Sequence, residues 1–206
     1  AQLRLTYRFA TPAERAWMEG HAARVSEVVD FRSMAVAGPE GAEERALTQV
    51  KAVDGAWPLL GAAVLEPPLP LAEALSEGGD SGTGGGGALP GGVMERALAA
   101  RLGIAPGDTF RLGLQTFRLT AILVSEPDSG GGALALGPRT VVRSAALAES
   151  GLLAPGTLFE TDYRLLLRPG DSLPALAAAA REAFAGAGMA WRDRSGAAPG
   201  VEEFVR

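Results

Sequence analysis

The sequence predicts an α+β domain in which both ends of the chain form one split β-α-β lobe and the middle forms an inserted, mostly β lobe. Two observations support this fold class. Each end shows a strand pattern, then a helix pattern, then further strand patterns, whereas the middle contains mainly short apolar alternations separated by turn residues. Two such end units commonly pair into one sheet with helices on one face. We place the end lobe at residues 1–54 and 158–206 and the inserted lobe at residues 55–157.

The N-terminal unit begins with strand-like alternation. Residues 3–9 read LRLTYRF, and apolar and polar side chains alternate along them, which is typical of a half-buried strand. Thr11, Pro12 and Glu14 follow in the pattern of a helix N-terminus with a capping box. We therefore expect a helix over residues 12–23.

Strand patterns follow this helix and return at the end of the chain. Residues 24–37 and 45–53 are β-like and are separated by Gly38-Pro39, which predicts a β-hairpin. The elements predicted for the C-terminal unit are a strand over residues 158–168, a helix capped by Asp171 or Ser172, and a strand over residues 189–194.

The inserted lobe contains a glycine-rich run over residues 78–92. Glycine loses the most backbone entropy on ordering, so this run predicts a mobile loop. The other elements predicted here are a short helix near 70–76, two strands that meet near Gly113, strands over 133–136 and 140–142, and a short helix over 145–149.

The clearest local signal lies at residues 93–113. Helical spacing over residues 93–102 places Met94, Leu98 and Leu102 on one face. Gly103 fits a left-handed C-cap, Ile104 fits its hydrophobic contact, and Pro106-Gly107-Asp108 predicts a sharp turn. We expect a helix docked on a small sheet.

Composition excludes several classes of protein. The net charge of −5 argues against a nucleic-acid partner, because phosphate binding requires a basic face. The chain contains no cysteine, which excludes disulfides, a thiol nucleophile and a cysteine-based zinc site. Its most apolar stretch, Trp57 to Leu65, is far shorter than the ~20 residues that cross a bilayer. We expect a soluble domain.

Two short motifs resemble catalytic or nucleotide-binding signatures. Residues 79–82 read GDSG, the nucleophile motif of chymotrypsin-like serine proteases, and His21 precedes it as required, with Asp30 or Asp54 between them. Ser81, however, lies in the glycine run, where no rigid scaffold would hold it against a base. The GxGxxG match at residues 82–87 is equally weak, because five residues separate it from the next predicted helix. We predict no catalytic residue and keep a serine hydrolase as a remote alternative.

Several charged residues could be functional or structural. Glu126 and Asp128 flank Pro127, and Glu160 and Asp162 follow later; these acids could form a general acid/base pair or a calcium site. Loop acids beside proline are usually solvated, so we expect no metal or cofactor here. Arg139 follows Gly137-Pro138 at a predicted strand start, where an ion-paired structural residue is expected.

An apolar, proline-stiffened segment begins at Trp57. Trp57, Pro58, Leu59 and Leu60 either pack under the inserted lobe or are displayed to a partner or substrate. Core packing is the simpler interpretation. The segment is nevertheless the candidate interface.

Five segments occur in an order that resembles the large extracytoplasmic domain of MacB/FtsX-type ABC transporter permeases, and especially the YbbP-like branch. They are VDGAWPLLG (53–61), LAARLGIAPGDTFRLG (98–113), FRLTAILVSEPD (117–128), LGPRTVV (136–142) and PGTLFETDYRL (155–165). The resemblance covers nearly the whole chain, and LGIAPGDTFRLG is its most specific piece. Trp57 departs from the family, in which tyrosine is more common there.

The resemblance implies a Porter-like lobe from both chain ends and a Sabre-like lobe inserted between them. It also implies mechanotransmission: an ATP-binding cassette subunit would move the membrane helices, and this domain would act on a lipophilic substrate or a periplasmic protein partner. ATP would bind that separate cytoplasmic subunit, with no cofactor in this domain. A dimer is expected in the full permease, at the periplasmic face of the inner membrane.

The chain ends agree with this expectation. Ala1 begins directly in a predicted strand, and residues 200–206 resemble the approach to a following membrane helix. The alternative function is that of a free-standing periplasmic binding module. A signal peptide directly before Ala1 would indicate this alternative.

Overall fold

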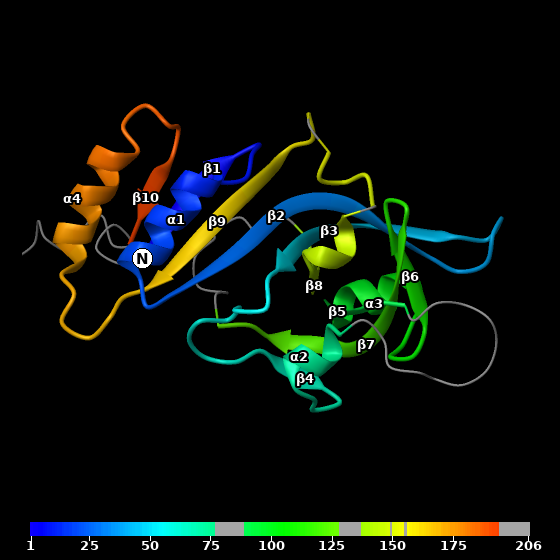
Figure 1. The fold of residues 1–206 in the computed structure, drawn as a ribbon. Coiled ribbons are helices and arrows are strands. Elements are labelled where there is room, and N and C mark those ends of the chain that lie inside the picture. Colours follow the sequence, from blue (N-terminus) through cyan, green and yellow to red (C-terminus); the bar gives the residue numbers. More distant parts are fainter. Residues whose placement is uncertain (77–88, 128–136, 149, 155, 194–206) are drawn as a thin grey trace, which may run out of the picture.

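The computed structural model describes residues 1–76, 89–127, 137–148, 150–154 and 156–193 (Figure 1). The strands are β1 (Gln2–Thr6), β2 (Arg24–Ala37), β3 (Glu44–Val53), β4 (Val64–Glu66), β5 (Gly91–Glu95), β6 (Thr109–Leu112), β7 (Gln115–Ser125), β8 (Arg139–Arg143), β9 (Phe159–Leu166) and β10 (Ala190–Arg192). The helices are α1 (Pro12–His21), α2 (Leu71–Ala74), α3 (Arg96–Leu102) and α4 (Leu173–Ala183), with a 3-10 turn, η1 (Ala145–Leu147). The α+β fold class is confirmed.

The described strands form one mixed sheet in the order β10-β1-β9-β2-β3-β8-β5-β7-β4, while β6 pairs with β2 and β7. Its first four strands come from the two chain ends, and each is antiparallel to its neighbours. The expected pairing of the two β-α-β units is therefore present. The division into Porter-like and Sabre-like lobes, with boundaries near residues 54 and 158, stays a prediction, because one sheet runs through both parts.

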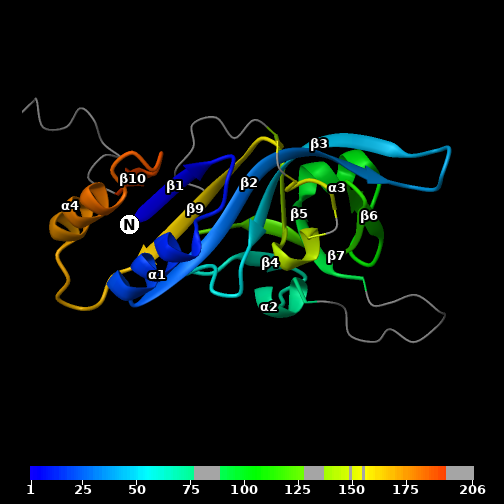
Figure 2. The ribbon, with the colours of Figure 1, turned by 45° about the horizontal axis from the view of Figure 1, so that its top comes forward.

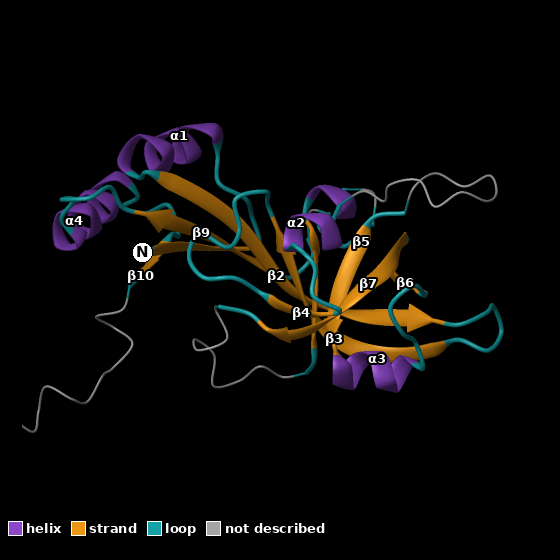
Figure 3. Ribbon diagram, turned by 90° about the horizontal axis from the view of Figure 1, so that it is seen from below, coloured by secondary structure: helices purple, strands orange, loops and turns teal. Residues whose placement is uncertain are grey.

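Helices α1 and α4 cover the same side of the end strands (Figure 3). Their apolar positions meet the alternate side chains of β1 and β9 in one buried cluster. Its buried members are Leu3, Leu5, Met18, Ala22, Tyr163, Leu165, Ala180 and Phe184. Ser172, one of the two predicted caps, accepts a hydrogen bond from the Ala175 amide at the start of α4.

The long hairpin of β2 and β3 joins the two parts of the molecule. β2 pairs with β9 from Arg24 to Phe31 and meets β6 near its other end, at Ala35 and Val36 (Figure 2). Successive residues of β2 point to opposite faces. Val28 thus belongs to the cluster that contains α2, and Val29 to the larger cluster that contains α3.

The capping box predicted at the start of α1 is present. The Thr11 hydroxyl accepts a hydrogen bond from the Glu14 amide at 3.3 Å, and the Glu14 carboxylate accepts one from the Thr11 amide at 2.7 Å. Arg8 also binds this carboxylate through two nitrogens, at 2.7 and 2.8 Å. The helix ends at His21, two residues earlier than expected.

This arrangement predicts a pH-dependent stability. Hydrogen bonding to Arg8, followed by smaller contributions from Thr11, lowers the pKa of Glu14 to about 2 from its ordinary 4.5. A depressed folded-state pKa stabilises the protein above the unfolded pKa, and this stabilisation is lost as pH falls toward the folded value. Glu14→Gln should therefore lower stability at pH 7, and the difference from the parent chain should shrink between about pH 4.5 and 2 in urea titrations. A constant difference across that range would contradict the assignment; exposed Glu40→Gln is the control.

Two predictions in the inserted part are wrong in detail. The helix expected over residues 93–102 begins only at Arg96, because residues 91–95 form β5 between β7 and β8. Gly91 and Gly92, assigned to the mobile run, are accordingly buried strand residues. Residues 78–88 of that run and the strand expected at 133–136 lie outside the described residues.

The joint after α3 is confirmed. Gly103 adopts a left-handed conformation with φ of 67°, and Ile104 packs against the larger apolar cluster. The Asp108 carboxylate accepts a hydrogen bond from the Ala105 amide at 2.8 Å and closes the predicted turn. β6 and β7 then form a hairpin through Gly113, at which φ is 56°.

Candidate functional site

The fold buries the first residue of the candidate interface Trp57–Leu60 and exposes the last. The Trp57 side chain is only 4% exposed and belongs to the apolar cluster beneath α2. Pro58 and Leu59 are half-buried, and Leu60 is 63% exposed. Core packing therefore accounts for Trp57, and Leu60 is the residue of this segment that a partner could reach. The interface role itself stays a prediction.

Asp54 fixes the entry to this segment. Its carboxylate accepts hydrogen bonds from the amides of Ala56 and Trp57, each at 3.0 Å. It also accepts one from the Ser26 hydroxyl at 2.9 Å and one from the Glu27 amide at 2.7 Å. The end of β3 is thereby tied to the start of β2, and the Trp57 ring is directed under the sheet.

A buried charged cluster lies next to the Trp57 ring and consists of Lys51, Glu126 and Arg139. Lys51 Nζ donates to both Glu126 oxygens, at 2.8 and 2.7 Å, and Arg139 Nη1 forms an ion pair with the same carboxylate. The side chains of Lys51 and Glu126 are 4% and 2% exposed. Lys51 Nζ also lies 5.4 Å from the centre of the Trp57 ring, within range of a cation–π contact.

The three members of the charged cluster come from different parts of the chain. Lys51 lies on β3, Glu126 directly follows β7, and Arg139 begins β8. β3 is half of the long hairpin, whereas β7 and β8 belong to the inserted part. Because the cluster is largely desolvated, separating the partners would leave uncompensated buried charge. It therefore holds the inserted part against the hairpin.

Asp30 is a further charged residue of the sheet, beside the charged cluster. It lies opposite Lys51 in the β2–β3 ladder and opposite Glu160 in the β2–β9 ladder. Burial raises the pKa of the Asp30 carboxyl, an effect that the nearby Lys51 partly opposes. Asp162 and Glu160, further along, form ion pairs with Arg4.

The charged cluster changes the interpretation of two predicted residues. The expectation that Glu126 is solvated beside Pro127 is wrong, because Lys51, 75 positions earlier in the chain, and Arg139 neutralise it in the interior. The expectation that Arg139 is an ion-paired structural residue is confirmed. A usable signal was present in the sequence: Lys51 is the chain's only lysine and interrupts the apolar residues Val50, Ala52 and Val53 at the end of its strand.

A small apolar edge lies at the outer border of the sheet, where β4 pairs with β7. Val64 is 51% exposed and Val124 57% exposed. Gly61, next to Leu60, approaches Pro127 so closely that an added Cβ would lie 2.8 Å from the proline Cβ. We call the exposed apolar residues Leu60, Val64 and Val124 the edge patch.

The structure describes only some of the residues considered for catalysis. His21 stacks on Trp17, and its Nδ1 lies 2.7 Å from the Trp17 carbonyl oxygen. Ser81, the 82–87 motif and Asp128 lie outside the described residues. Among the residues that are described, no group of three or more His, Cys, Asp or Glu side chains is placed to hold a metal ion. That part of the chain also contains no helix with the length and apolarity to cross a membrane.

The fold is similar to that of the extracytoplasmic domains of two ABC transporters. The periplasmic region of MacB from Actinobacillus actinomycetemcomitans matches with a TM-score of 0.57 and 7% identity, over 100% of this chain and 94% of that structure. The extracellular domain of the noncanonic ABC-type transporter YknZ from Gram-positive bacteria matches with a TM-score of 0.52 and 13% identity, over 94% of this chain and 100% of that structure.

A sequence match agrees with this class. The chain is 28% identical to the ABC transporter permease YbbP of Escherichia coli K12 over 160 residues, which are 76% of this chain and 18% of YbbP. The chain thus spans less than a fifth of that relative. No family model matches. The resemblance expected from the sequence motifs is confirmed.

Proposed function

We propose that this chain is the extracytoplasmic domain of an ABC transporter permease and passes ATP-driven movement of the membrane helices to a periplasmic substrate or partner. The observation that carries the proposal is the agreement of two independent matches. A permease is similar in sequence over three quarters of the chain, and the MacB periplasmic region has the same fold over all of it.

The sheet is suited to transmit a movement. It continues without a break from β10, which pairs with the N-terminal strand β1, to β4 at the edge patch, and the charged cluster braces the long hairpin against the inserted part. Buried ion pairs favour one geometry over nearby ones, since a shifted pair loses its compensation. A displacement at the chain ends would then reach the edge patch as motion of a stiff body.

The partners follow from this role. An ATP-binding cassette subunit would act through the membrane part, ATP would bind there, and this domain would need neither a cofactor nor catalytic residues. We place the domain at the periplasmic face of the inner membrane, paired with a second copy in the full permease. A lipophilic substrate or a periplasmic protein would contact the edge patch through Leu60.

The proposal predicts nucleotide-dependent movement of this domain. In the full permease with its ATPase, reconstituted in nanodiscs, a spin label at Glu182→Cys on exposed α4 should report a distance between the two copies. This chain contributes no native cysteine, so the label is specific within it. We expect the distance distribution to shift between the nucleotide-free and vanadate-trapped states. Identical distributions would reject coupling, and the absence of a dipolar signal would reject the paired arrangement.

A further inference from the structure

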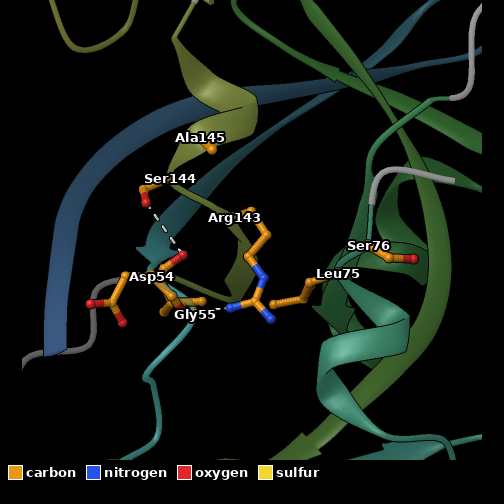
Figure 4. A pocket seen from close by; sticks show the side chains of 8 residues that line it. Asp54, Gly55, Leu75, Ser76, Arg143, Ser144 and Ala145 are labelled. Carbon is orange, nitrogen blue, oxygen red and sulfur yellow. Dashed lines mark hydrogen bonds between the residues drawn. The ribbon is translucent and has the colours of Figure 1, made fainter. Parts of the chain in front are cut away.

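A hollow of about 410 Å³ lies where β3 and β8 end beside α2 (Figure 4). Its exposed apolar residues are Gly55 and Ala145, and the buried residues Val53 and Leu75 lie behind its surface. Arg143, the last residue of β8, extends into it, and Figure 4 shows the guanidinium between Gly55 and Leu75. The volume falls in the range of sites that bind small molecules, about 300–1,000 Å³.

The guanidinium of Arg143 is only partly used by the protein. It donates from Nη1 to the carbonyl oxygen of Asp54, whereas a guanidinium carries five donor hydrogens. Within the described residues no carboxylate forms an ion pair with it, in contrast to Arg139, which shares Glu126. The Asp54 carboxylate is not its partner, because that group accepts from Ser26 and from the amides of Glu27, Ala56 and Trp57.

A half-buried cation beside apolar residues favours a ligand that has both an anionic group and an apolar group. A planar carboxylate fits the fork of one guanidinium through paired hydrogen bonds. A doubly charged phosphate would need more than one cation, and among the described residues that line the hollow Arg143 is the only charged side chain besides Asp54. The exposed apolar residues then offer contact to an alkyl chain, which gains free energy with each methylene removed from water.

We propose that this hollow binds a carboxylate amphiphile, a medium-chain fatty acid, with its head group on Arg143 and its alkyl chain over the exposed residues Ala145 and Gly55. The site lies apart from the edge patch and does not depend on the proposed coupling. Its binding can be measured on this chain without an ATPase, so the two proposals succeed or fail separately.

The test is an NMR titration of the ¹⁵N-labelled 206-residue chain with octanoate below its micellar concentration. We expect saturable shifts confined to the amides around Gly55, Leu75, Arg143 and Ser144. 1-Octanol supplies the alkyl chain without the charge, acetate supplies the charge without the chain, and both should bind at least ~10-fold more weakly, as should Arg143→Gln. Arg101→Gln, at an exposed position of α3, is the matched control and should bind like the parent.

A second variant blocks the hollow while keeping the cation. Gly55 lines the hollow and has no neighbouring atom within 4 Å of an added Cβ, so Gly55→Phe can be accommodated and we expect its ring to occupy part of the hollow. It should abolish octanoate binding, and the spectra themselves report whether each variant is folded. The proposal is overturned if 1-octanol binds as well as octanoate, if Arg143→Gln binds octanoate unchanged, or if the shifts fall elsewhere. Tighter binding of octyl phosphate than of octanoate would overturn the choice of a carboxylate.

Discussion

Replacing Glu126 by Gln is expected to lower the free energy of unfolding by about 3–5 kcal/mol, the cost of removing one partner from a buried ion pair. The carboxylate is 2% exposed and is shared by Lys51 and Arg139. Its loss leaves two cations side by side in the interior, and an amide keeps the shape of the side chain without the charge. The cost is therefore electrostatic and does not come from a cavity.

Chemical denaturation at neutral pH measures this effect. Glu66→Gln is the matched control, because Glu66 pairs with Arg96 at the surface, where both side chains are at least 60% exposed, and such a pair contributes about 0–1 kcal/mol. Lys51→Met should cost less than Glu126→Gln, since Arg139 still neutralises the carboxylate. If Glu126→Gln were no more costly than Glu66→Gln, the charged cluster would not hold the inserted part in place.

Features encoded by neighbouring residues could be predicted from the sequence. Thr11 and Glu14 form a capping box through contacts three residues apart, and Gly103 needs only its own backbone freedom to end a helix. The hairpin of β2 and β3 also follows from local alternation and a turn. In each case the decisive interaction lies within the window in which the pattern is visible.

Features that depend on distant partners could not be predicted in this way. Residues 93–95 fit a helical pattern, but β7 and β8 supply strand partners on both sides, and this pairing outweighs the local preference. Met94 is buried in the strand, as it would be on the apolar face of the predicted helix, so the apolar pattern does not distinguish the two conformations. The burial of Glu126 likewise depends on partners that only the folded chain brings to it.

The candidate site shows the same limit. The sequence marked Trp57–Leu60 as one apolar segment, and the fold places its first residue inside and its last outside. No pattern in the sequence indicated that Arg143 lines a hollow, because the residues around it come from the ends of β3, β8 and α2. The residue types predicted that the segment is apolar. They did not predict which of its side chains are accessible to solvent or to a ligand.

Gly91→Ala is the second substitution with a large expected effect, about 3 kcal/mol of destabilisation, at the upper end of the usual cost of overpacking. A Cβ added at Gly91 would lie 2.1 Å from the carbonyl oxygen of Ala74, a backbone atom that no side-chain rotation can move. The same carbonyl accepts a hydrogen bond from Thr120 at 2.8 Å, and the Gly91 amide donates to Ser76 at 2.9 Å. One methyl group must therefore separate α2 from β5 and weaken both hydrogen bonds.

Urea denaturation compares this variant with Gly55→Ala, in which the new methyl group meets no atom within 4 Å. Gly55 is exposed, so we expect its substitution to change stability by no more than about 0.5 kcal/mol. Gly55 and Gly91 lie at the two ends of a glycine- and proline-rich part of the sequence. Composition alone does not distinguish their structural roles. Equal and small effects would mean that residue 91 belongs to the mobile run predicted from composition, whereas a large cost confined to Gly91→Ala would place it in the packed strand β5.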